Sequence, residues 1–104
     1  LGLRTVRLAM EEPELFALAA TWMRRQLDGP PPPPVVAALR ADPRLAHASL
    51  DRLTQVNALL WTFTQGLAAM VHPDGAITSL AQARAHLTTA GDAIIGHVAT
   101  LPDP

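Results

Sequence analysis

The hydrophobic positions of this chain follow a helical period, most clearly in the charge-free stretch between Arg52 and Asp74. Large apolar residues recur there at three- and four-residue spacing, which places them on one face of an α-helix. They are Leu53, Val56, Leu60, Phe63, Leu67 and Met70. Because a surface helix normally shows one charged face to water, we expect this helix to be covered on more than one side.

Small residues lie roughly opposite that large apolar face, and the last helix repeats the design. The large residues of the last helix are Leu80, Leu87, Ile94, Val98 and Leu101. The two small-residue ridges are Ala58, Thr62, Gly66 and Ala69 in the long helix and Ala85, Thr89, Ala93, Gly96 and Thr100 in the last one. Small side chains allow helix backbones to approach closely, so we predict that both ridges meet a second copy in a four-helix interface. The alternative is that these residues merely reflect the high helix propensity of alanine.

Proline and glycine divide the first half of the chain. A helical segment over residues 3–27 is predicted to break near Pro13, because proline suits the first turn of a helix and disrupts its interior. The five prolines at 30–34 predict a stiff polyproline spacer, with recognition by an SH3 or WW domain as the less common use. A short helix is expected over residues 35–41.

Capping residues predict the helix boundaries in the second half of the chain. Asp42, followed by proline, is expected to close the short helix and to cap the long helix, which extends to about Val71. Residues 72–75 form a turn sequence. The sequence SLAQ beginning at Ser79 matches a capping box, and the last helix is predicted to extend to Leu101. No strand-like alternation accompanies these periods, which predicts an all-α helical bundle.

Composition indicates one domain with an extensive interface. A chain of 104 residues holds one modest core, so residues 1–104 are expected to form a single domain. The chain is 49% hydrophobic but only 16% charged, against a usual charged share of about 25%. That imbalance suggests a large interface, either with a second copy in a homodimer or with a part of the protein outside this chain. The polar side chains inside the charge-free stretch argue against a membrane span.

Charge and cysteine content narrow the function classes further. The net charge is −1 and no basic patch is present, so this segment is not expected to bind nucleic acid by itself. The absence of cysteine fits a cytoplasmic protein. The first residue is Leu1, which indicates a piece of a longer or processed protein.

Residue patterns for catalysis or metal binding are lacking. No Glu-x-x-His pair accompanies the four histidines, and neither serine lies in a Gly-x-Ser-x-Gly elbow. We therefore expect no enzyme activity, no metal and no cofactor.

The aromatic residues suggest a candidate ligand pocket. Trp61 lies one helical turn from Gln65, with Asn57 and Thr64 beside it, and a large ring with few polar groups on an apolar wall is typical of a small-molecule pocket. It is equally typical of a packed core around one hydrogen-bonded tryptophan. The candidate ligand-binding residues are Phe16, Trp22, Met23, Asn57, Trp61, Phe63 and Thr64.

Two segments carry a resemblance to a known family. VRLAMEEPELFALA and LLWTFTQGLAAMV make the chain resemble the C-terminal regulatory domain of tetracycline-repressor (TetR) family transcription regulators, in the variant named for a Trp-His-Gly signature. Trp61 and Gly66 match the signature's Trp and Gly, whereas Gln65 stands at its His and cannot titrate near neutral pH.

The resemblance implies a function. A repressor of this kind dimerises through its last two helices, binds a small and usually apolar effector among its helices, and contacts DNA through an N-terminal helix-turn-helix that this chain lacks. The competing interpretation is a structural helical interaction module that binds no ligand.

Overall fold

The computed structural model describes residues 2–24, 29–71 and 74–103, with side chains left undescribed at residues 19–24. This part of the chain folds into α-helices and one 3₁₀ turn, which confirms the all-α prediction. The elements are α1 (Gly2–Glu11), α2 (Pro13–Arg24), α3 (Pro33–Arg40), η1 (Pro43–Leu45), α4 (Leu50–Ala69) and α5 (Leu80–Val98).

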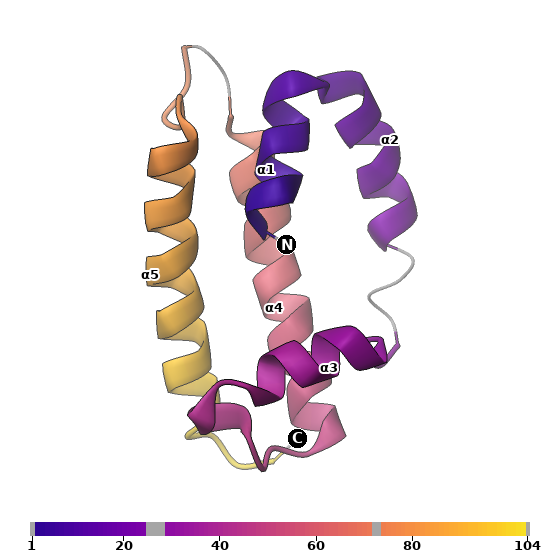
Figure 1. The fold of residues 1–104 in the computed structure, drawn as a ribbon, viewed down its shortest axis with the longest axis vertical. Helices are drawn as coiled ribbons and strands as arrows, with labels where there is room; N and C mark the ends of the chain where they lie inside the picture. The colour runs from indigo at the N-terminus through magenta and orange to yellow at the C-terminus, as the bar shows by residue number, and fades with distance from the viewer. Residues whose placement is uncertain (1, 25–28, 72–73, 104) are drawn as a thin grey trace.

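The two long helices, α4 and α5, form the centre of the fold (Figure 1). They run side by side in opposite directions, and α1 packs against both of them. The short helix α3 crosses α4 near the end where α4 begins, while α1 covers the other half (Figure 1). Different elements therefore cover the two ends of the α4–α5 pair.

The hydrophobic core is divided accordingly into two clusters. The α1 cluster consists of Val6, Ala9, Leu67, Ala68, Ile77 and Ala83. The α3 cluster consists of Leu39, Leu45, Leu53, Val56 and Val98. The large apolar face predicted for the long helix supplies buried residues to both clusters, as its helical spacing requires.

Proline placement explains the first three helices. Pro13 is the first residue of α2, as predicted, because its fixed φ suits that position and its missing N–H has no helical partner there. The spacer prediction was wrong at its end, since α3 begins at Pro33 rather than at residue 35. The last two prolines of the run occupy the first turn of α3, where no backbone donor is needed.

The long helix starts later than the sequence pattern indicated. Asp42 caps only the 3₁₀ turn η1, where its side chain accepts a hydrogen bond of 2.9 Å from the Arg44 backbone N–H. Ser49 is the cap of α4 and accepts from the Arg52 N–H at 3.1 Å. The prediction of one helix from residue 42 overlooked this serine, whose hydroxyl favours a cap over a helix interior.

The last helix confirms the predicted cap but with different partners and an earlier end. Ser79 accepts from the Gln82 N–H at 3.2 Å, while the Gln82 side chain accepts from the Thr78 N–H rather than from that of Ser79. The helix ends at Val98, so Thr100 and Leu101 lie beyond it, and Leu101 is 39% exposed. Met70, the C-cap of α4, is likewise 57% exposed. Both residues were wrongly assigned to the buried face.

Arg44 ties the 3₁₀ turn to α5. Its guanidinium donates to the Asp42 carboxylate at 2.8 Å and to the Asp92 carboxylate at 2.9 Å. The side-chain hydrogen bond from Arg44 lowers the pKa of Asp42 from 3.8 to about 2. Charge-assisted hydrogen bonds of this kind favour the ionised carboxylate.

Folding stability should therefore depend on Asp42 at acid pH. The pKa of this group is lower in the folded state than in the unfolded state, so its contribution is present above pH 3.8 and is lost as the pH falls toward about 2. Asp42→Asn keeps a capping side chain but removes the charge. We expect the variant's urea midpoint to approach that of the wild type as the pH is lowered from 5 to 2. A constant difference between the two urea midpoints across that range would show that protonation of Asp42 does not affect stability.

None of the described helices combines the length and the apolar character that crossing a bilayer requires.

Candidate functional site

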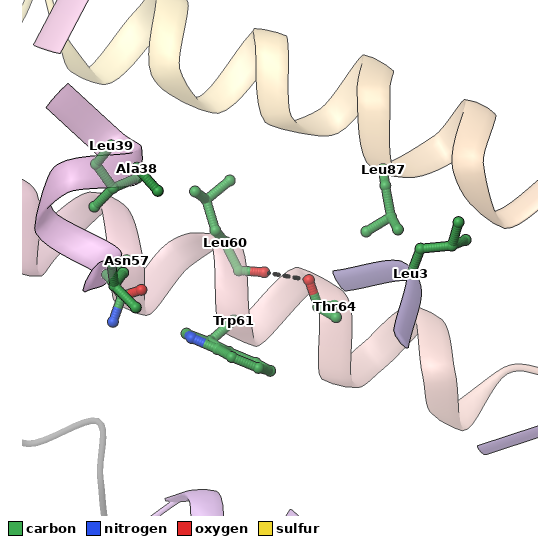
Figure 2. A pocket seen from close by; sticks show the side chains of 9 residues that line it. Leu3, Ala38, Leu39, Asn57, Leu60, Trp61, Thr64 and Leu87 are labelled. Atoms are coloured by element: carbon green, nitrogen blue, oxygen red, sulfur yellow. Dashed lines mark hydrogen bonds between the residues drawn. The ribbon is translucent and has the colours of Figure 1, made fainter. Parts of the chain in front are cut away.

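An apolar cavity of about 260 Å³ lies between the two core clusters. Its walls come from α1, α3, α4 and α5 (Figure 2). The lining residues are Leu3, Val35, Ala38, Leu39, Asn57, Leu60, Trp61, Thr64 and Leu87.

The cavity lies over the middle of the α4–α5 pair, which neither α1 nor α3 covers. Leu3, at the start of α1, lines one end, and Val35 and Leu39 of α3 line the other. Between them Leu60 of α4 and Leu87 of α5 point into the space between these two helices (Figure 2). Because α1 packs over one half of the pair and α3 over the other, neither fills the space between them.

Three predicted ligand-binding residues meet in this cavity. Asn57, Trp61 and Thr64 lie at spacings of four and three residues on one face of α4, as the sequence indicated (Figure 2). Thr64 is buried, and its hydroxyl donates to the backbone carbonyl of Leu60 at 2.8 Å. Asn57 and Trp61 are partly buried.

The other candidates lie elsewhere. Phe16 and Phe63 pack against the α1 cluster and are not among the lining residues. The side chains of Trp22 and Met23 lie outside the described part of the structure. An aromatic residue on an amphipathic helix can serve core or cavity alike, so sequence reasoning could not separate Phe63 from Trp61.

Sequence reasoning missed the lining residues that come from other helices. Leu3, Val35, Ala38, Leu39 and Leu87 belong to α1, α3 and α5. Their apolar character predicts burial, but no local pattern indicates that they converge on one cavity. Only the packing of the helices brings them to Trp61.

The small-residue ridges contribute no residue to either core cluster. Ala58 is partly buried, and Thr62, Gly66, Ala69, Ala85, Thr89 and Ala93 are exposed in the single chain. Gly96 differs, because a Cβ atom there would lie 3.3 Å from Nη1 of Arg44. Arg44 of the same chain therefore covers that end of the α5 ridge.

A second, polar hollow lies at the end of the bundle near the start of α4. Arg52 and Ser49 line it together with Asp103 of the C-terminal tail. Arg52 is only 4% exposed, and its guanidinium donates to the backbone carbonyls of Leu101 and Pro102. These contacts hold the C-terminal tail against α4. They give Arg52 a structural role that its position before the charge-free stretch of the sequence did not reveal.

Among the described residues, no three His, Asp or Glu side chains gather closely enough to hold a metal ion.

Comparison with known proteins identifies no similar protein. No protein-family model matches the chain, and neither the curated proteins nor the solved structures contain a significant match.

Proposed function

We propose that this chain is the ligand-sensing and dimerisation domain of a TetR-family transcription repressor in the cytoplasm. It binds a small, mainly apolar effector in the cavity, dimerises through α4 and α5, and controls DNA binding by an N-terminal helix-turn-helix domain that lies outside this chain. The proposal rests on the sequence resemblance and on the arrangement of α4.

The observation that supports it best is that α4 carries two different faces. Asn57, Trp61 and Thr64 line the cavity on one side, whereas Thr62 and Gly66 lie exposed on the ridge. A ligand that displaces the cavity face of α4 also displaces the ridge, because a helix moves as a rigid element. The effector then needs only a different affinity for the two dimer arrangements in order to shift the spacing of two DNA-binding heads.

Absence of charge supports the dimer half of the proposal. The exposed ridges contain only alanine, glycine and threonine, and large apolar side chains lie exposed beside the α4 ridge. Among them Leu59 is 41% exposed. The α4 ridge carries no charged side chain and suits a second copy of itself, because a two-fold interface pairs each patch with itself. Charged side chains border the α5 ridge: Arg7 and Arg84 share a hollow with Ala85 and Thr89.

Substitution Gly66→Leu tests the dimer half. A Cβ atom added at Gly66 would meet no atom of another part of the chain within 4 Å, so we expect the fold to accept a side chain there. In a close helix contact the added bulk should weaken association by about tenfold or more. Sedimentation velocity at several concentrations measures this change.

The matched control is Ala37→Leu, which adds bulk to an exposed position of α3 away from the ridges. It should leave the dimer intact. A wild-type chain that is strictly monomeric at micromolar concentration, or a Gly66→Leu dimer of unchanged affinity, would contradict this use of the ridge.

A further inference from the structure

Two polar groups at the cavity have no hydrogen-bond partner among the residues that the structure describes. Neither the amide of Asn57 nor the indole N–H of Trp61 forms a hydrogen bond with any group in the described part of the chain. Both side chains are partly buried and lie one helical turn apart. The nitrogen-bearing edge of the Trp61 ring points toward Asn57 (Figure 2).

These two groups differ from the other polar group of the cavity. The hydroxyl hydrogen of Thr64 is already used in the bond to the Leu60 carbonyl. Asn57 offers two amide hydrogens and one acceptor oxygen, whereas Trp61 offers one indole hydrogen that can only donate. The available hydrogens on this wall therefore suit an acceptor atom on a ligand.

The charge of the lining restricts that ligand further. No charged side chain is among the described residues that line the cavity. An ionised group placed there would lose its hydration without gaining an opposite charge, which is far more costly than burying a neutral polar group. The cavity should therefore favour uncharged compounds.

The volume of the cavity limits the size of the ligand. An apolar cavity of about 150 Å³ is large enough to bind benzene. The cavity here is about 260 Å³, so it has room for one ring with a short substituent or for two fused rings. Leucines of four elements would contact the ring, while Asn57 and Trp61 lie along one wall.

We propose that the cavity selects uncharged aromatic or alicyclic compounds that carry one carbonyl oxygen, and that this oxygen accepts hydrogen bonds from the Asn57 amide and the Trp61 indole. The inference rests on the proposed function, because it takes the cavity to be the effector site. Asn57 and Trp61 are then the residues that determine ligand specificity.

Three compounds of similar size test this inference: ethylbenzene, acetophenone and benzoate. Isothermal titration calorimetry should show that acetophenone binds the wild-type protein about tenfold more tightly than ethylbenzene, since each net hydrogen bond contributes a few-fold in affinity. Benzoate should bind at least tenfold more weakly than acetophenone, because its carboxylate is charged.

Two variants separate the hydrogen bonds from the apolar contacts. Asn57→Leu keeps a similar volume without the amide, and Trp61→Phe keeps an aromatic ring without the N–H. Each should bring the preference for acetophenone over ethylbenzene to within about threefold while ethylbenzene still binds. Thr88→Val, at an exposed position of α5 outside the cavity and outside both ridges, is the control that should leave the preference unchanged.

The outcomes distinguish this inference from the proposed function. Equal binding of acetophenone and ethylbenzene by the wild type, tightest binding of benzoate, or an unchanged preference in both variants would overturn the inference while leaving a ligand-binding cavity. Failure of all three compounds to bind at millimolar concentration would overturn the inference together with the ligand half of the proposed function.

Discussion

Replacing Leu53 with alanine is expected to lower the free energy of unfolding by about 3 kcal/mol. Leu53 is fully buried in α4, within the cluster that joins α3, η1 and the end of α5. Alanine removes the apolar contacts of the side chain and leaves a hole that its neighbours fill only in part. A domain of this size has a total stability of about 5–15 kcal/mol, so the loss is a large fraction of it.

Urea denaturation at one fixed protein concentration measures this loss, because dimerisation makes stability depend on concentration. Leu50→Ala is the matched control: it makes the same change at the first residue of α4, where the side chain is 50% exposed. It should cost less than about 1 kcal/mol. Equal losses in the two variants would show that Leu53 is not part of a packed core.

The second large effect is expected at Arg52. Its guanidinium donates to the Leu101 carbonyl at 2.6 Å, to the Pro102 carbonyl, and to the Gln55 side chain at 2.9 Å. Arg52→Met keeps the length of the side chain but removes all of these donors. We expect a loss of about 2 kcal/mol, because hydrogen bonds that involve a charged group contribute more than neutral ones.

The loss should be local in origin. The freed carbonyls lie near the surface, where Leu101 is 39% exposed, so water can replace part of what the arginine supplied. Hydrogen exchange should accelerate at the end of α5 and in the first turn of α4, while the middle of α4 changes less. Urea denaturation provides the global value.

Two further variants define which contact of Arg52 matters. Arg52→Lys keeps the charge but loses the planar set of guanidinium donors. The stability of this variant should therefore lie between that of the Arg52→Met protein and that of the wild type. Asp103→Asn should change stability by less than about 0.5 kcal/mol, since that carboxylate is 71% exposed and lies 3.9 Å from Nε of Arg52. An Arg52→Met protein as stable as the wild type would remove the arginine from the support of the C-terminal tail.

Much of the helical organisation was predictable because its causes are local. The break at Pro13 and the cap at Ser79 each depend on a backbone constraint or a hydrogen bond within a few residues. The start of α4 was misplaced because two capping residues, Asp42 and Ser49, compete within one segment. The 3₁₀ turn η1 lies between Asp42 and Ser49, and its Leu45 packs into the α3 cluster.

The candidate site was predictable only along one helix. The spacing of Asn57, Trp61 and Thr64 places them on one face of α4, and the structure brings all three to one cavity. The sequence could not reveal that Phe63, two residues beyond Trp61, packs into the α1 cluster instead. It also could not reveal that the neighbouring wall comes from α3.

The sequence by itself determined where most helices break and which faces of α4 and α5 are large or small, because propensity, capping and the 3.6-residue period act between near neighbours in the chain. Only the tertiary structure decided that α1 and α3 cover opposite halves of the α4–α5 pair and leave a cavity between them. It likewise decided that Arg52 is buried beneath the C-terminal tail. Burial of a side chain depends on which distant segments pack over it, and that is set by the sum of contacts across the whole fold.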